Sequence, residues 1–82
     1  MPLVTFYGKP GCHLCDDALA VLERVRAQRS FDLREVDVTI DPILYREYGE
    51  RIPVLAVDGE ELFEFHVDEA VLLERLDRVN DS

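Results

Sequence analysis

The sequence is organised around residues 6–15, which read Phe6-Tyr7-Gly8-Lys9-Pro10-Gly11-Cys12-His13-Leu14-Cys15. This stretch leaves an apolar, strand-like segment, turns through glycine and proline, and places both cysteines of the chain where a helix begins. Two residues separate Cys12 from Cys15, so the two side chains can meet within one helical turn. Reactive side chains are concentrated nowhere else in the sequence, and we expect any chemistry to occur here.

Length and composition predict one small folded domain spanning residues 1–82. The chain is 48% hydrophobic and 33% charged, which is typical of a globular protein with a single modest core. No apolar run approaches the ~20 residues that span a bilayer, and residues 1–5 lack the basic flank of a signal peptide. We therefore expect a cytoplasmic monomer that does not enter the membrane, where paired cysteines serve catalysis or metal binding more often than structural disulfides.

The charge balance argues against a nucleic-acid-binding protein. Eighteen acidic residues face nine basic ones, which gives a net charge of -9. The sequence has no run of lysine or arginine that would form the positive stripe required by a phosphate backbone. An anionic partner would have to be held by local cations against this field.

The rest of the sequence alternates between strand and helix patterns. Hydrophobic periodicity predicts strands over 3–7, 31–38, 52–57 and 60–65, and helices over 12–29, 42–48 and from 69 onward. In the second strand, the apolar alternation continues to Ile40, and a change of register predicts a bend or an edge position. The first helix is expected to bury Leu14, Ala18, Leu22 and Val25, and the last to bury Leu72, Leu76 and Val79.

Local signals mark where these elements begin and end. Asp41-Pro42 predicts a helix start, with an acidic cap followed by proline at the first helical position. Gly49 is expected to end that helix through a left-handed residue. Asp58-Gly59 predicts a hairpin turn, and Asp68 predicts the cap of the last helix.

The order is strand, helix, strand, helix, strand, strand, helix. Its first part is a βαβ unit, which implies parallel strands and a right-handed crossover, and its second part is an antiparallel hairpin followed by a helix. A four-stranded mixed α/β sheet with helices on both faces accommodates this order. This is the layout of the thioredoxin fold.

The position of the cysteines at a helix start predicts redox chemistry. Free backbone amides and the positive end of the helix dipole stabilise a thiolate there. Cys12 lies nearer the helix end and the flexible loop, so we expect it to be the nucleophile and Cys15 the resolving thiol. A protonated His13 would stabilise the thiolate further, whereas Asp16 and Asp17 would oppose it.

Two other uses of the cysteine pair stay open at this point. A zinc site would need further ligands, and only His13 and His66 are available as histidines, so we expect no metal. The cysteines could also be inert core residues, although the glycine-rich approach loop favours exposure.

Residues 7–15 and the later Arg51-Ile52-Pro53-Val54 resemble glutaredoxins, and in particular a group of small bacterial glutaredoxin-like proteins. The resemblance implies a thiol–disulfide oxidoreductase that binds no cofactor. It also implies that the partner is glutathione, as reductant or substrate, or a protein disulfide or dithiol. The cysteine motif with its preceding Lys-Pro-Gly is the more specific part of the likeness, and the Ile-Pro-Val segment is shorter.

The resemblance also implies which residues bind the substrate. The expected substrate-binding residues are Tyr7, Lys9, His13, Arg51, Ile52, Pro53 and Asp68. Pro53 matches a cis proline beside the cysteine pair, and the backbone of Ile52 matches the one that pairs with an extended thiol substrate. Lys9 matches a lysine that contacts a carboxylate of glutathione, Arg51 would add a second cation, and Asp68 resembles the acid that meets the glutathione amine.

The sequence departs from glutaredoxins at two places. Where they carry Gly-Gly before the last helix, this chain has Phe65-His66-Val67-Asp68, and His13-Leu14 replaces the usual Pro-Tyr between the cysteines. The first departure leaves a protein disulfide open as the substrate. It also motivates an alternative, a non-catalytic module that docks an extended peptide beside Pro53.

Overall fold

The computed structural model describes residues 1–81. Along the chain it contains β1 (Leu3–Gly8), α1 (His13–Arg26), β2 (Asp32–Asp37), the short 3-10 helix η1 (Val38–Ile40), α2 (Pro42–Tyr48), β3 (Val54–Val57), β4 (Glu60–Glu64) and α3 (Glu69–Asp81). The predicted order of strands and helices is confirmed. Only η1 is an addition to it.

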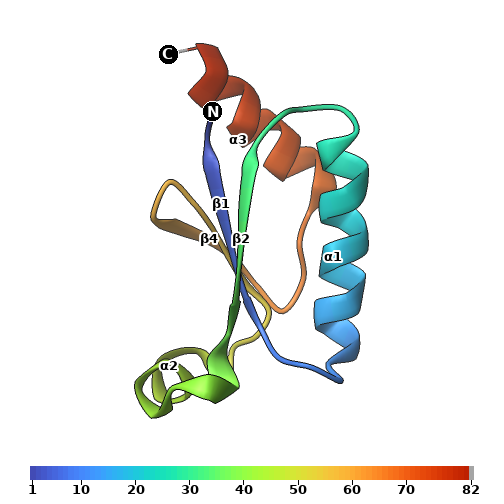
Figure 1. The fold of residues 1–82 in the computed structure, drawn as a ribbon. Helices are drawn as coiled ribbons and strands as arrows, with labels where there is room; N and C mark the ends of the chain where they lie inside the picture. Colours follow the sequence, from blue (N-terminus) through green and yellow to red (C-terminus); the bar gives the residue numbers. More distant parts are fainter. Residues whose placement is uncertain (82) are drawn as a thin grey trace.

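The four strands form one mixed sheet in the order β2-β1-β3-β4. Strand β1 is parallel to β2 and antiparallel to β3, and β3 is antiparallel to β4. Strand β2 therefore lies at an edge, as its change of register predicted. Helices α1 and α3 lie on one side of the sheet, and α2 lies on the other side, near the end of β2 (Figure 1). The predicted α/β architecture is confirmed.

The core lies between the sheet and the pair α1 and α3. In the antiparallel register of β1 and β3, Val4 faces Val57 and Phe6 faces Leu55, so alternate residues of both strands point to the same face. The core side chains come from β1 (Val4, Phe6), β3 (Leu55, Val57), α1 (Ala18, Leu22, Val25) and α3 (Leu72, Leu76), and all are at most 4% exposed.

The buried face of α1 differs from the predicted one at its first turn. Cys15 is buried, at 2% exposed, whereas Leu14 is only half-buried and lies to one side of the core. At the other end, α1 stops at Arg26 rather than near Arg29. The backbone N–H groups of Gln28 and Arg29 both donate hydrogen bonds to the carbonyl of Val25, at 2.9 and 2.8 Å. These two bonds end the helix in a turn.

The expected alternation from Val36 to Ile40 is wrong beyond Asp37. The carboxylate of Asp37 accepts hydrogen bonds from the backbone N–H and the hydroxyl of Thr39, at 2.8 and 2.6 Å. These bonds cap η1 and curl the chain away from the edge of the sheet. Val38 is consequently buried and Ile40 is 77% exposed.

The helix starts were predicted correctly, but the backbone conformation at the end of α2 was not. Asp41 caps α2 by accepting the N–H of Ile43 at 2.8 Å, and Asp68 caps α3 by accepting the N–H of Val71 at 3.1 Å. Gly49 has a φ of -55° and is not left-handed. Its physical role is steric, because a Cβ there would lie 2.5 Å from the carbonyl oxygen of Tyr45.

The turn between β3 and β4 has the predicted hairpin form. Asp58 and Gly59 both have positive φ, at 50° and 88°, which matches the twist of the two flanking strands. Both strands are shorter than expected: β3 begins at Val54, after Pro53, and β4 ends at Glu64, because Phe65 adopts a φ of 67°.

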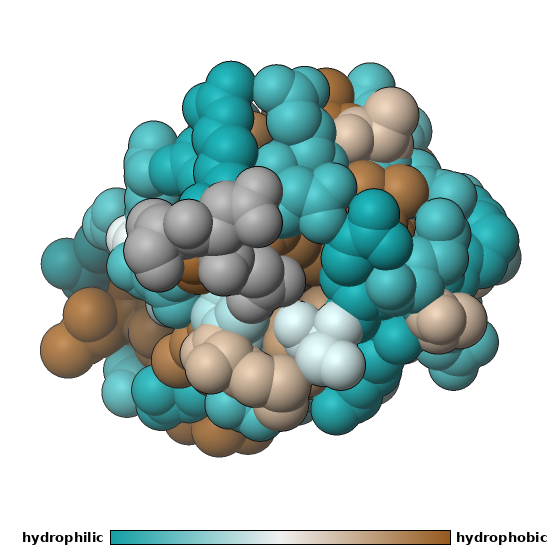
Figure 2. Space-filling view, turned by 90° about the horizontal axis from the view of Figure 1, so that it is seen from above, coloured by the Kyte–Doolittle hydropathy of each residue, from teal (hydrophilic) through white to brown (hydrophobic). Residues whose placement is uncertain are grey.

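Helix α1 begins at the end of the molecule opposite the N-terminus and α3 (Figure 1), and both cysteines lie at this helix start. Figure 2 shows the terminal end, where hydrophilic residues cover most of the surface and hydrophobic residues form small separated areas. Among residues 1–81, no helix combines the length and the apolar character needed to cross a membrane.

Candidate active site at the start of helix α1

Cys12 is the N-cap of α1. Its backbone is extended, and its Sγ accepts a hydrogen bond from the backbone N–H of Cys15 at 3.2 Å. A sulfur atom thus occupies the place that an oxygen takes in most helix caps. The bond and the positive end of the helix dipole both favour negative charge on this sulfur. Gly11, which directly precedes Cys12, has a φ of 75° and adopts the left-handed backbone of the turn that leads into this cap.

Cys15 lies behind Cys12 in the core. Its burial raises the pKa of the Cys15 thiol from 9.0 to about 11, and its hydrogen bond to Cys12 acts in the same direction, while the backbone N–H of Lys9 opposes the shift. Neither cysteine is in a disulfide bond, and Cys12 is the more exposed of the two. The order of exposure is the one expected from the sequence.

Gly8 makes room for the buried thiol. A Cβ at this position would lie 3.0 Å from the Cys15 Sγ and 2.8 Å from Cε1 of Phe6. Glycine at the end of β1 is therefore required by the close approach of the sulfur and the aromatic ring to the backbone.

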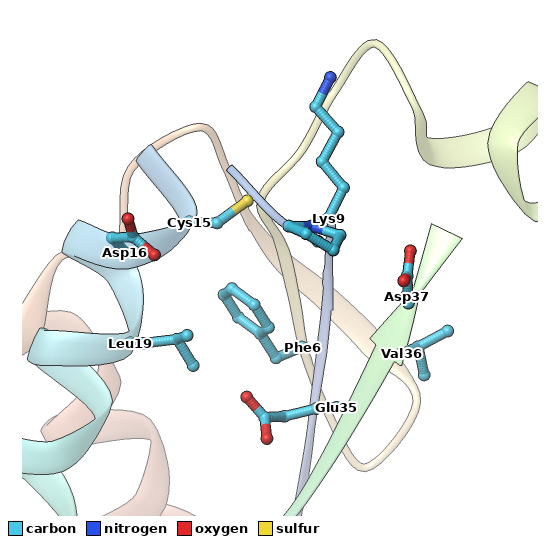
Figure 3. A pocket seen from close by; sticks show the side chains of 10 residues that line it. Phe6, Lys9, Cys15, Asp16, Leu19, Glu35, Val36 and Asp37 are labelled. Atoms are coloured by element: carbon cyan, nitrogen blue, oxygen red, sulfur yellow. The ribbon is translucent and has the colours of Figure 1, made fainter. Parts of the chain in front are cut away.

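A pocket of about 350 Å³ opens beside Cys15, between α1 and β2. Figure 3 shows Glu35 pointing from β2 toward α1, while the Lys9 side chain extends away from it. The carboxylates that line the pocket belong to Asp16, Glu35 and Asp37. Glu35 and Asp37 were not among the expected site residues, although the parallel pairing of β2 with β1, with Glu35 beside Phe6, places them here.

The peptide bond between Ile52 and Pro53 is cis, as the resemblance implied. The carbonyl of Pro53 accepts the backbone N–H of Phe65 at 2.8 Å. Ile52 lies outside the strands, and within residues 1–81 its own backbone N–H and carbonyl form no hydrogen bond.

Tyr7 and Arg51, both expected to bind substrate, belong to one cluster on the α2 side of the sheet. The ring of Tyr7 stacks on that of Tyr48, with centroids 4.1 Å apart, and the Arg51 guanidinium lies 5.3 Å from the Tyr48 centroid. The guanidinium also forms ion pairs with Glu61 at 3.0 Å and Glu64 at 2.8 Å. These carboxylates raise the pKa of Arg51, and the guanidinium is engaged by the protein itself.

The other expected substrate-binding residues lie at the surface. Lys9 and His13 are exposed on either side of the loop that leads to Cys12. Asp68 caps α3 through one carboxylate oxygen. The structure therefore brings together Cys12, Cys15 and the backbone of Lys9, whereas Tyr7 joins Arg51 through Tyr48.

The chain also resembles known proteins along nearly its whole length. The sequence model of the "Glutaredoxin-like domain (DUF836)" family matches residues 3–77. An uncharacterised protein of Mycobacterium tuberculosis is 32% identical over 73 residues, covering 83% of this chain and 75% of that protein.

Two solved structures show the same architecture. A structural-genomics target protein, XcR50 from X. campestris, has a TM-score of 0.77 and 34% identity, covering 92% of this chain and 96% of that one. A mutant thioredoxin from Halobacterium salinarum has a TM-score of 0.68 and 24% identity, covering 94% and 73%, and shows the fold alone. The chain therefore belongs to the glutaredoxin-like domain family (DUF836) and has the thioredoxin fold.

Proposed function

We propose that this protein is a thiol–disulfide oxidoreductase in which Cys12 attacks and Cys15 resolves. One observation carries the proposal: the Cys12 Sγ caps α1 and accepts the Cys15 N–H at 3.2 Å, with the Cys15 thiol buried behind it. This arrangement stabilises charge on the outer sulfur and holds the inner one within reach of it.

The reaction has two steps. The Cys12 thiolate attacks one sulfur of a substrate disulfide, the other sulfur leaves as a thiolate, and a mixed disulfide forms on Cys12. Cys15 then loses its proton and attacks the Cys12 Sγ, which releases the second substrate thiol and leaves a Cys12–Cys15 disulfide. The substrate gains two electrons from the protein, and an external thiol or dithiol must return them.

The proton of Cys15 needs an exit, because the raised pKa keeps this thiol protonated at neutral pH. The pocket beside Cys15 supports such an exit, since it opens to water and carries the Asp16 and Glu35 carboxylates. On the substrate side, the unpaired backbone N–H and carbonyl of Ile52 would bind an extended segment beside the disulfide.

We propose glutathione or a protein disulfide or dithiol as partner, with no bound cofactor, in a monomer of the reducing cytoplasm. In the sequence, Lys9 is the cation nearest to the two cysteines, and it would attract an anionic group of the substrate. His13, which follows Cys12 directly, would face the same group.

The test is the rate at which the reduced protein cleaves a small disulfide under steady-state supply of a dithiol. Cys12→Ser should abolish the activity, and Cys15→Ser should accumulate the mixed disulfide and turn over more slowly, because only the external dithiol can then release Cys12. Ala20→Ser, an exposed change on the same helix, is the matched control and should be fully active. Wild-type rates in the Cys12→Ser variant would overturn the proposal.

A second candidate is a non-catalytic module that binds an extended peptide, which the unpaired backbone groups of Ile52 favour. Such a module would keep its affinity for a peptide after both cysteines were replaced by serine. For a zinc-binding domain there is no such support, because residues 1–81 contain no group of three or more His, Cys, Asp or Glu arranged to hold a metal ion.

A further inference from the structure

Phe65 adopts a backbone conformation that is unusual for a residue with a side chain. The His66 N–H donates to the Glu64 carbonyl at 2.7 Å across Phe65, whose φ is 67°. This is a γ-turn with a positive φ at its central residue, a rare and strained form for any residue other than glycine. The N–H of Phe65 donates to the Pro53 carbonyl, which holds the turn beside the proline.

The turn displays the Phe65 ring at the edge of a groove. Phe65 is 42% exposed, and the segment between β4 and α3 runs alongside α1 (Figure 1). The groove measures about 180 Å³ and is lined by Leu14, Ala18 and Val21 with Asp17 on α1, and by Phe65, His66 and Val67 opposite. Leu14 stands between the two cysteines in the sequence, so the groove starts at the turn that carries the nucleophile.

The charges at this groove favour a cation. Asp17 is exposed and, within residues 1–81, forms no ion pair, and neither lysine nor arginine lines the groove. Asp68 follows directly after Val67, and the whole chain carries a net charge of -9. Glutathione has two carboxylates, one amine and no large apolar side chain. It would therefore make few favourable contacts with the apolar residues and the Asp17 carboxylate of this groove. A polypeptide with an apolar and a basic residue suits both the Phe65 ring and the Asp17 carboxylate.

We propose, resting on the oxidoreductase function above, that this groove selects protein disulfides in which an apolar residue and a Lys or Arg flank the cysteine. The apolar side chain lies between Leu14 and Phe65, and the cation faces Asp17. The Phe65 γ-turn then determines substrate specificity, because it places an aromatic ring at a position where a glycine would leave only exposed backbone.

The experiment compares cysteine peptides that are each linked by a disulfide to the same chromophoric thiol. One peptide carries Leu and Lys beside the cysteine, one Leu and Glu, and one two glycines; oxidised glutathione is the fourth substrate. Rates are expressed as kcat/KM with dithiol in excess. We expect the wild type to prefer the Leu-Lys peptide to the Gly peptide by roughly tenfold or more, in the range that one apolar pocket supplies.

Three variants separate the contributions. Phe65→Gly and Phe65→Asn both tolerate a positive φ, so the turn can persist without the ring, and both should reduce the Leu-Lys to Gly ratio to about two or less. Asp17→Asn should abolish only the preference for Lys over Glu. Ile43→Ala, which removes an apolar side chain that is 75% exposed on α2, is the control and should leave every ratio unchanged.

Equal kcat/KM for the three peptides, a preference for oxidised glutathione, or ratios that survive both Phe65 variants would overturn the inference. These failures differ from failure of the proposed function, in which no substrate would be cleaved in a Cys12-dependent way. A protein that cleaves all four substrates alike keeps the oxidoreductase function and loses the specificity.

Discussion

The buried position of Cys15 predicts a steep pH dependence for the second step of the reaction. Cys15 attacks only as a thiolate, and burial raises its pKa from 9.0 to about 11. Each unit of pKa changes the thiolate fraction about tenfold. At pH 7 the shift of about two units therefore makes this fraction roughly a hundredfold smaller than that of a thiol with the ordinary pKa. The step should accelerate by about tenfold per pH unit between pH 6 and pH 9.

Formation of the mixed disulfide removes one cause of the raised pKa of Cys15. Once Cys12 is bonded to substrate, its thiol no longer contributes to the raised pKa of Cys15, whereas burial, the largest cause, remains. The midpoint of the pH profile should then fall between 9 and 11, and the slope below pH 9 should persist.

Rapid mixing with an excess of an aromatic disulfide that releases a coloured thiolate resolves the two steps. The first release of colour follows attack by Cys12 and depends on reagent concentration, and the second follows attack by Cys15 and does not. Cys15→Ser should retain the first phase and lack the second. A second phase that is independent of pH, or that levels off below pH 8, would show that Cys15 does not attack with a raised pKa.

Three further predictions concern the stability of the fold, measured by urea unfolding. Gly8→Ala should lower the free energy of unfolding by about 1–3 kcal/mol, because its Cβ would lie 2.8 Å from the ring of Phe6 and 3.0 Å from the Cys15 Sγ; an unchanged midpoint would contradict this. Leu72→Ala should lower it by about 2–5 kcal/mol, since Leu72 is fully buried beneath the sheet, whereas Val71→Ala at a half-exposed neighbouring site should have a small effect. Because the folded state raises the pKa of Cys15, the stability gained by keeping its thiol neutral is present below pH 9 and declines toward pH 11, so the wild type should lose more stability than Cys15→Ala between pH 8 and pH 10.

Signals confined to a few adjacent residues were sufficient to predict most of the element boundaries. Asp41 and Asp68 cap helices because a short acidic side chain reaches an amide two or three residues ahead. Asp58-Gly59 forms the hairpin because both residues tolerate positive φ. The order of the elements then restricted the topology to a mixed sheet.

Features that depend on distant contacts could not be predicted in this way. Strand β2 ends at Asp37, where the Asp37 carboxylate accepts hydrogen bonds from the backbone N–H and the hydroxyl of Thr39 and caps η1. The turn at Phe65 requires the Pro53 carbonyl, which is twelve positions away in the chain. Gly49 carries a signal for positive φ, yet what the structure requires at this position is space beside Tyr45 rather than a left-handed backbone.

In the candidate site, too, features with a local sequence signal were predicted, and features that depend on distant contacts were not. The position of the motif at a helix start predicted that Cys12 would be the more exposed of the two cysteines, whereas the burial of Cys15 and the capping role of the Cys12 Sγ were not predicted. The pocket with Glu35 depends on the parallel register of β1 and β2, and the engagement of Arg51 by Glu61 and Glu64 depends on β4. Neither arrangement has a signature within a short stretch of sequence.

The central claim, that Cys12 is the nucleophile and Cys15 the resolving thiol, is tested most directly by mass spectrometry of the intact Cys15→Ser variant. The reduced variant is incubated with oxidised glutathione or a peptide disulfide, and the adduct is located by proteolysis. We expect one substrate thiol per chain, attached at Cys12, and an internal disulfide without adduct in the wild type. An unmodified Cys15→Ser variant in the presence of every disulfide tested, with a wild type that forms no internal disulfide, would contradict it.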